Sequence, residues 1–441
     1  MSFRSLFRAF ALSLLLFPYA TFAEKNEPIT YAVSGEDLNK RQAEVERHLS
    51  EVYSFWLDPA REDKEFGGFQ YYLDEFLQPA GPTRKNIMMH LRMLYNYAVG
   101  AGAGEGKRFP GLEGRLERQL DYLEERFRDG KDNLWHYELE RDGTPVPRDQ
   151  KLMIAQVYVI YLLSEVHLMT GNKRALRLAS ETFARIESAH DPRNGGYRQL
   201  LDPKSLELEN LRKSCATNLH MLLALSRLAK ADDNPLYRER LMEIYELLPR
   251  YVEPASGNAY WALTADWQAI PFGEGINNRT MYGHNAEMIW YMTEAAPVAG
   301  RETSELVPFL RRMARGLLDY GISPDGAVYF FGPINGASDD RQVQWWAPVE
   351  TMIAFVRLYR LTGDADYWAT YCRIADWTFS HFVPKSTPGA WYTVAQPGGE
   401  ISDKSRGGFI WKSGFHEIRG LTILQKELME IARVKHASSP K

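Results

Sequence analysis

Cysteine is scarce in this 441-residue chain, and the chain has no excess of basic residues. Only Cys215 and Cys372 occur, which excludes a fold held by a framework of disulfides and leaves open whether the two pair. Lysine and arginine number 53 against 57 aspartates and glutamates, so the formal net charge is −4 at pH 7. This balance argues against nucleic acid or an anionic membrane surface as the partner.

Long apolar runs are also rare, and the clearest one lies at the N-terminus. Arg4 and Arg8 precede an apolar run over residues 9–17, and small residues follow up to Ala23. This order predicts a secretory signal peptide over residues 1–23, cleaved after Ala23. The alternative is an uncleaved N-terminal anchor, but the run is too short for an ordinary spanning helix, and no other segment approaches that length. We therefore expect a periplasmic or secreted protein without membrane contact after cleavage.

Signatures of several enzyme classes are absent from the sequence. The chain has no glycine-rich phosphate loop, no nucleophile elbow and no catalytic Cys-His signature. It also lacks a low-complexity linker that would divide it. Because a closed repeat forms one domain even at this length, we predict a single domain over residues 24–441.

The chain does contain a repeat, with a period of 62 to 69 residues. An aromatic residue ends a short turn in each of six units. These residues are Phe69, Trp135, Tyr197, Tyr260, Tyr329 and Trp391. Self-similarity of this kind is typical of arrays built from one supersecondary unit.

Two kinds of helix alternate within the repeat. In the first kind, apolar residues such as Val45, Leu49 and Trp56 follow a single face, which is typical of an outer layer. In the second kind, apolar residues surround the helix, as over residues 155–168 and 349–361, and such helices are buried on most sides. Six alternating pairs predict an all-α fold, an (α/α)6 barrel of six inner and six outer helices.

A polar residue recurs 21 to 25 positions after each aromatic mark. These residues are Arg92, Tyr158, His220, His284, Glu350 and His416. They fall near the starts of the predicted inner helices, where Thr217, Asn218 and Ser413 are candidate N-caps and Pro348 fits a first turn. Inner helices of such a barrel are roughly parallel, so we expect the six side chains to surround one pocket.

Three of these six residues are histidines, which take and return protons near neutral pH. Two such bases across a pocket suit removal of a proton next to a carbonyl and its return to the opposite face. Arg92 would hold the enediolate oxygens. Glu287, three residues after His284, would orient that imidazole or hold a substrate hydroxyl. Zinc held by the three histidines is an alternative, but each is alone on its helix, without the close spacing typical of zinc ligands.

Five segments in order along the chain carry a family resemblance. They are Arg92-Met93-Leu94-Tyr95-Asn96-Tyr97, Asn218-Leu219-His220, Tyr282-Gly283-His284-Asn285-Ala286-Glu287, Trp345-Trp346-Ala347-Pro348-Val349-Glu350 and Trp411-Lys412-Ser413-Gly414-Phe415-His416-Glu417-Ile418-Arg419. Through them the chain resembles the N-acylglucosamine 2-epimerase superfamily, which includes cellobiose 2-epimerases and mannose isomerases. The resemblance implies a six-fold α/α barrel that acts at C2 of aldoses without a metal or redox cofactor.

The resemblance also implies roles for individual residues. His284 and His416 would be the proton-transfer pair, and Arg92 would touch the reacting oxygens. His220 would help to bind or open the sugar ring. The remaining candidates would position the sugar: Asn218, Glu287, Glu350, Trp346 and Trp411.

The chain departs from the family pattern at four positions. Ala216 stands where many members have Asn, Ile154 where Tyr is frequent, and Pro348 where members have Gln. Glu417 places an acid beside His416, and we expect it to raise the pKa of that imidazole. We expect these four changes to fall in the pocket and to affect which sugar is bound.

We therefore predict a carbohydrate 2-epimerase or aldose–ketose isomerase, a monomer or homodimer that acts on a mono- or oligosaccharide without a cofactor. One alternative is an exported glycoside hydrolase or polysaccharide lyase on the same barrel, with Glu287 and Glu350 as its carboxylates. The other is a catalytically silent sugar-binding member of the family.

Overall fold

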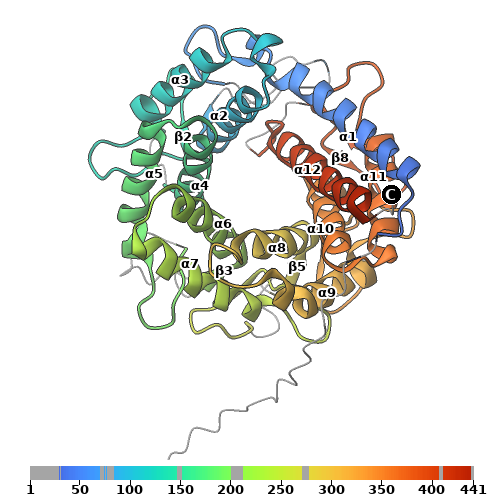
Figure 1. Cartoon of the computed structure of the whole chain (residues 1–441). Helices are drawn as coiled ribbons and strands as arrows, with labels where there is room; N and C mark the ends of the chain where they lie inside the picture. Colours follow the sequence, from blue (N-terminus) through green and yellow to red (C-terminus); the bar gives the residue numbers. More distant parts are fainter. Residues whose placement is uncertain are drawn as a thin grey trace, which may run out of the picture.

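The computed structural model describes residues 29, 31–69, 74, 76, 84–146, 151–199, 212–270, 278–406 and 411–438. Within these residues, twelve α-helices form a closed ring with an inner and an outer layer (Figure 1). The predicted (α/α)6 barrel is therefore confirmed, whereas the predicted signal peptide over residues 1–23 lies outside the described residues. Cys215 and Cys372 are both free thiols.

Inner and outer helices alternate along the chain. The inner helices are α2 (Ile87–Gly102), α4 (Met153–Thr170), α6 (Cys215–Ala231), α8 (Tyr282–Ala295), α10 (Trp346–Thr362) and α12 (Phe415–Ser438). The outer helices are α1 (Gly35–Trp56), α3 (Leu112–Tyr122), α5 (Lys173–Ile186), α7 (Pro235–Leu247), α9 (Val307–Gly316) and α11 (Ala365–His381). Each outer helix after α1 packs against the inner helix that precedes it, whereas α1 packs against α12, the last helix. Because α12 also contacts α2, the two ends of the chain close the ring (Figure 1).

Inner helix α4 is apolar on nearly every side. Most of its residues are buried, and it packs between α2, α5 and α6. Among the described residues it is the single helix that is long and apolar enough to cross a membrane by length and composition. The expectation that no segment beyond the N-terminus approaches a spanning helix is therefore wrong, because a helix enclosed by protein needs the same apolar surface as one enclosed by lipid.

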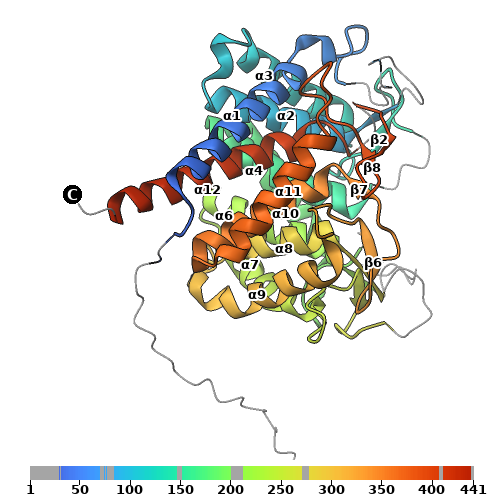
Figure 2. The same cartoon turned by 90° about the vertical axis from the view of Figure 1, so that its right-hand side faces the viewer.

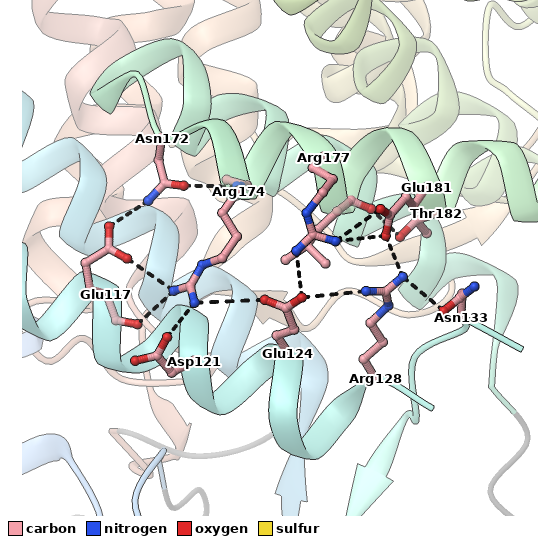
Figure 3. A network of polar contacts seen from close by, with 12 residues as sticks. Glu117, Asp121, Glu124, Arg128, Asn133, Asn172, Arg174, Arg177, Glu181 and Thr182 are labelled. Carbon is pink, nitrogen blue, oxygen red and sulfur yellow. Dashed lines mark hydrogen bonds and ion pairs between the residues drawn. The ribbon is translucent and has the colours of Figure 1, made fainter. Parts of the chain in front are cut away.

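Outer helix α5 has a single apolar face. Phe183 and Ile186 are buried, as the predicted outer layer requires. On the opposite face, Arg174 and Arg177 bond acids of α3 and of the short helix η3 (Leu123–Phe127) at 2.6 and 2.7 Å (Figure 3). Exposed ion pairs contribute only about 0–1 kcal/mol each, so this network positions neighbouring outer helices more than it stabilises them.

Glycine ends two of the inner helices. Gly171 after α4 and Gly363 after α10 have φ angles of 72° and 70°, a left-handed conformation that a Cβ disfavours. Asn172 and Asp364 then cap α5 and α11 by accepting backbone N–H groups. These residues turn the chain from the inner layer to the outer layer.

The six turns repeat, but two of the predicted aromatic marks are displaced by one residue. The mark is fully buried in four units, at Phe69, Trp135, Tyr197 and Trp391. In the other two units the buried residue is Ala259 or Val328, and Tyr260 and Tyr329 are only partly buried. Isolated bridges show the same register, since Ala259 and Val328 pair with residues before their turns. Successive side chains in extended backbone point to opposite sides. A shift of one residue therefore turns the aromatic side chains of Tyr260 and Tyr329 away from the core.

A lysine–aspartate ion pair ties the turn to the following inner helix in three units. The pairs are Lys85–Asp63 at 3.3 Å, Lys151–Asp129 at 2.6 Å and Lys213–Asp191 at 2.9 Å. Each aspartate also accepts backbone N–H groups of its own turn. The lysine therefore fixes the turn relative to the start of the inner helix.

Short antiparallel strands lie at one end of the barrel (Figure 2). The pairs are β1 (Lys85–Asn86) with β2 (Glu138–Leu139), β3 (Arg212–Ser214) with β4 (Ala262–Thr264), and β5 (Arg279–Met281) with β6 (Phe331–Pro333). The last sheet joins β7 (Val343–Gln344), β8 (Val394–Ala395) and β9 (Ile401–Asp403). One strand of each sheet leads directly into an inner helix, and its partner belongs to the next unit. The strands therefore join neighbouring units where the inner helices begin.

A chain of ion pairs crosses the inner helices nearer their C-terminal ends. Arg227 of α6 bonds Glu165 of α4 at 2.6 Å and Glu294 of α8 at 3.1 Å. Arg357 of α10 bonds Glu294 at 2.9 Å and Glu427 of α12 at 2.7 Å. Five of the six inner helices are therefore linked by alternating charges.

Candidate active site

A cavity of about 540 Å³ lies among the N-terminal ends of the inner helices and the strand segments that precede them. Small-molecule sites typically have volumes of roughly 300–1,000 Å³. Seven predicted site residues line it: Arg92, His220, His284, Glu287, Trp346, Trp411 and His416. The other two, Glu350 and Asn218, are not among the described residues of its wall. The three histidines therefore share one cavity, as the repeat predicts.

His416, near the start of α12, has its tautomer set by Glu350 of α10. Its Nδ1 lies 2.6 Å from Oε1 of that carboxylate. A carboxylate only accepts, so Nδ1 donates and Nε2 keeps a lone pair. Burial lowers the pKa of His416 to about 3 in spite of this hydrogen bond. His416 is therefore a neutral base in the wall of the cavity at pH 7.

His284, near the start of α8, contacts two indole rings. Its ring centroid lies 6.0 Å from that of Trp261, nearly parallel, and 5.6 Å from that of Trp346. Burial lowers the pKa of His284 to about 4, although the charge of Glu287 acts to raise it. His284 is therefore also neutral near pH 7.

His220 of α6 is held by the backbone of its own helix. Its Nδ1 donates to the carbonyl of Ala216 at 2.8 Å, and its Nε2 lies 3.8 Å from Oε2 of Glu287. The ring centroids of His220 and His284 are 6.1 Å apart. Burial lowers the pKa of His220 to about 3. Three neutral imidazoles therefore line the cavity.

Arg92 of α2 brings a positive charge to the cavity. It is almost fully buried, and its guanidinium lies 5.0 to 5.2 Å from the rings of Tyr158, Trp411 and Phe415. It donates to the carbonyl of Trp411 and to the hydroxyl of Tyr158. Both acceptors are neutral, so the charge of Arg92 is available to a developing oxyanion.

Arg419 of α12 is a buried cation whose role was not predicted from the sequence. It donates to Glu350 at 2.6 Å and to Glu287 at 3.3 Å, and it also bonds the hydroxyls of Tyr161 and Tyr291. Burial by itself would raise the pKa of Glu350, but the charge of Arg419 and the bond from the imidazole lower it to about 2. The pKa of Glu287 is raised, first by burial and then by the charge of Glu350.

Ligand atoms of Glu287, Glu350 and His416 lie within 4.8 Å of one another, a grouping suited to a metal ion. The guanidinium of Arg419 bonds both of these carboxylates. Arg419 therefore supplies positive charge where a cation would bind. The sequence does indicate that Arg419 lies near the site, because it follows His416 by three positions and therefore lies on the same face of the helix.

Glu350 supports His416 and does not line the cavity. It is fully buried, and its Oε1 accepts from both His416 and Arg419. Its Oε2 accepts from Nε1 of Trp290 at 3.0 Å. The predicted contact of Glu350 with the sugar is therefore replaced by contact with the imidazole.

The structure also corrects the prediction for Asn218, which binds a turn of the backbone. Its Oδ1 accepts the N–H of Tyr197 at 3.0 Å. His90 and Gln156 hold the equivalent turns of the first two units by the same kind of bond at 3.0 Å. These residues lie two positions before the cavity-lining residue of their helices and so point away from it.

None of the three predicted N-caps acts as a cap. Oγ of Ser214 accepts the N–H of Thr217 and caps α6, so Thr217 and Asn218 lie inside that helix. In the described part of the chain, Oγ of Ser413 has no hydrogen-bond partner. Pro348 does lie in the first turn of α10, as predicted.

The expected effect of Glu417 on His416 is wrong. Glu417 is fully buried and faces Lys412 and Trp345. Successive helix residues point about 100° apart, so the two side chains diverge. Burial dominates at His416 and lowers its pKa instead of raising it.

Two of the four departures from the family pattern line the cavity. Ala216 and Ile154 are in its wall, and the carbonyl of Ala216 holds His220. Pro348 and Glu417 are buried, and neither is among the described residues of the wall. The wall also contains Trp261 and Gln344, which were not predicted as site residues from the sequence.

Known proteins resemble this chain along most of its length. Residues 67–416 match the N-acylglucosamine 2-epimerase (GlcNAc 2-epimerase) family. A cellobiose 2-epimerase of Bacteroides fragilis is 25% identical over 395 residues, which are 85% of this chain and 96% of that protein. A D-mannose isomerase of Marinomonas mediterranea is 22% identical over 79% of this chain and 88% of that protein. The structure of cellobiose 2-epimerase from Bacillus thermoamylovorans covers 88% of this chain and 99% of its own, with a TM-score of 0.78 at 20% identity, and shows the shared fold.

An (α/α)6 barrel whose cavity is lined by three imidazoles and a guanidinium places the molecule in the class of sugar epimerases and isomerases. Because the family match spans most of the chain, the protein belongs to the N-acylglucosamine 2-epimerase family. The predicted resemblance and enzyme class are confirmed.

Proposed function

We propose that this protein is a carbohydrate 2-epimerase or aldose–ketose isomerase that moves a proton at C2 of a mono- or oligosaccharide through an enediolate. The observation that carries the proposal is the bond between His416 and Glu350, which leaves Nε2 of a neutral imidazole as a base in the cavity. A second imidazole, His284, lines the same cavity and contacts the same indole, Trp346.

The proton transfer begins at His416. Its Nε2 removes the C2 proton, and Glu350 stabilises the imidazolium that forms. The enediolate places negative charge on two oxygens, and Arg92 holds that charge. His284 takes up a proton from solvent and returns it to the opposite face of C2, which gives the 2-epimer, whereas return of a proton to C1 gives the ketose; His416 releases the proton that it removed to solvent. No step changes the oxidation state of the protein.

The remaining residues of the wall bind and open the sugar. His220 assists ring opening: its Nδ1 donates to Ala216, so its unprotonated Nε2 is left to remove the proton of the anomeric hydroxyl while the ring oxygen takes a proton from solvent. Oε1 of Glu287 accepts from Tyr291 and Arg419, so Oε2 is the oxygen that holds a substrate hydroxyl. Trp346 and Trp411 provide aromatic surface for the pyranose.

Glycoside hydrolysis is less well supported by the same geometry. It needs two carboxylates that both reach the scissile bond. Glu350 does not line the cavity and already accepts from His416, Arg419 and Trp290. One of the two required acids is therefore occupied.

We also propose that residues 1–23 direct export, which would place the mature enzyme in the periplasm or outside the cell. The basic, apolar and small residues of this segment support the proposal. N-terminal sequencing of the mature protein should begin at Glu24. An N-terminus at Met1 would contradict cleavage.

Deuterium exchange tests the proposed reaction. Aldoses and reducing disaccharides are incubated with the enzyme in D2O, and deuterium at C2 is followed by NMR together with 2-epimer and ketose. We expect exchange for at least one sugar and its loss in His416→Ala. His436→Ala is the matched control, because His436 is exposed on the same helix.

Each rival function has its own outcome in that experiment. Release of reducing sugar from a glycan, without exchange at C2, would favour a hydrolase. Sugar binding without exchange would favour a silent member of the family. Absence of C2 exchange for every sugar would contradict the proposal.

A further inference from the structure

Gly283 lies in the first turn of α8, directly before His284. A Cβ placed on Gly283 would lie 2.4 Å from two ring carbons of Trp346. Real side chains do not approach this closely, so the indole rests on the backbone of α8. Glycine in a helix costs about 0.5–1 kcal/mol relative to alanine. The contact with Trp346 gives a physical reason for glycine at this position.

The indole of Trp346 is restrained on several sides. Its Nε1 donates to Oε1 of Gln344 at 3.0 Å, and only 9% of the residue is exposed. Its ring centroid lies 5.6 Å from that of His284 and 5.5 Å from that of His416. The ring therefore packs beside both proposed bases, so a shift of the indole changes its packing against them.

We propose that Gly283 is a positioning residue: by admitting the indole of Trp346 against α8, it sets the placement of His284 relative to His416. This inference rests on the proposed two-base reaction. The placement decides how the enediolate is partitioned, because each base returns a proton to a different face of C2.

The partition is measurable in D2O. His416 removes the C2 proton, and the proton on its imidazole exchanges with solvent deuterium. Return from His416 regenerates the starting sugar with deuterium at C2. Return from His284 forms the 2-epimer, also labelled at C2. The ratio of labelled starting sugar to labelled epimer therefore reports how well the second base is placed.

Gly283→Ala should raise this ratio. The new methyl group displaces the indole, and misplacing a reacting group by about 1 Å costs on the order of 10²-fold in rate. We expect epimer formation to fall roughly 10- to 100-fold while exchange into the starting sugar falls much less. Gly114→Ala is the matched control, since Gly114 also lies in a helix and its nearest atom would be 3.7 Å away.

A double variant separates positioning from a general loss of structure. Trp346→Phe has a smaller ring, which leaves room for the methyl group of Gly283→Ala. We expect Gly283→Ala to cost less epimer formation in the Trp346→Phe background than in the wild type, a non-additivity typical of residues in contact. A loss confined to folding would not produce this recovery of the ratio.

Each contrary result either overturns the inference or contradicts the proposed function. An unchanged ratio in folded Gly283→Ala overturns it, and so do fully additive effects of the two substitutions. If Gly283→Ala does not fold, Trp346→Phe alone decides, because its smaller ring should also raise the ratio, and an unchanged ratio overturns the inference. Absence of exchange in the wild type instead contradicts the proposed function.

Discussion

His416 and Arg419, three residues apart on α12, donate to the same oxygen of Glu350. Nδ1 of the imidazole and Nη2 of the guanidinium each lie 2.6 Å from Oε1. The arginine keeps the carboxylate ionised, and the carboxylate fixes which nitrogen of His416 carries the proton. One helical turn of α12 therefore provides the base and the charge that maintains its acceptor.

Glu350→Gln should reduce catalysis more than binding. The amide carries no charge, so it stabilises the imidazolium of His416 less well. Arg419 also loses its ion pair with the carboxylate at this position. We expect kcat for C2 exchange to fall by on the order of 10²-fold or more, within the range of general-base effects.

Glu294→Gln is the matched control for that change. Glu294 is bonded by Arg227 and Arg357 in the chain of ion pairs nearer the other end of the inner helices. The Glu294→Gln substitution should lower the free energy of unfolding and leave the kinetics of the folded enzyme unchanged. A Glu350→Gln enzyme with the wild-type kcat would contradict the role of the carboxylate.

The pH dependence of activity follows from the two buried bases. Burial lowers the pKa of His284 to about 4 and that of His416 to about 3. His416 removes the C2 proton and must be neutral to do so, so C2 exchange is retained above its pKa and is lost as the pH falls through that value. The acid limb of kcat/KM for C2 exchange should therefore lie well below 6.5. An acid limb near 6.5 would show that the bases are ordinary, solvated imidazoles.

His90→Gln should change how stability depends on pH. The pKa of His90 is lowered from 6.5 to about 3 by burial. Below pH 6.5 the unfolded chain binds a proton that the folded chain excludes, so the free energy of unfolding falls as the pH decreases towards 3. This loss approaches about 1.4 kcal/mol per pH unit for one group.

The glutamine variant keeps the hydrogen bond and removes the titration. Gln156 already accepts the equivalent turn N–H in the second unit. Urea unfolding at pH 7.5 and pH 5 should therefore show a smaller difference for His90→Gln than for the wild type, with C2 exchange retained. Identical pH dependence of the two proteins would contradict the assignment.

Asn218→Leu should weaken the fold and leave the affinity for sugar unchanged. The leucine leaves the buried N–H of Tyr197 without its acceptor, and such a group costs about 1–3 kcal/mol. Chemical denaturation should show that loss, while KM for the exchanging sugar stays at the wild-type value. A raised KM with normal stability would restore Asn218 to the sugar site.

Much of the site was predictable because a repeat carries it. His220, His284 and His416 share a phase of the repeat, and parallel inner helices bring equal phases to the same depth. The two displaced marks, Tyr260 and Tyr329, show the limit of this reasoning. A shift of one residue leaves the period almost unchanged and reverses which side chain is buried.

The roles of side chains between helices were not predictable in this way. Glu350 and Asn218 are polar residues at the starts of inner helices, as His416 is, but they point to other partners. The direction depends on about 100° of helix rotation per residue and on what the adjacent helix presents. Arg419 was visible in the sequence, but its carboxylate partners come from α8 and α10.

The sequence by itself determined the period, the layering of the helices and the residues that share one end of the barrel. These follow from apolar spacing along a single segment, which is a local property. Only the tertiary structure decided the tautomer of His416, the lowered pKa values of the bases and the contact of Trp346 with Gly283. Each of these depends on atoms from helices far apart in the chain, and on burial that exists only after the ring has closed.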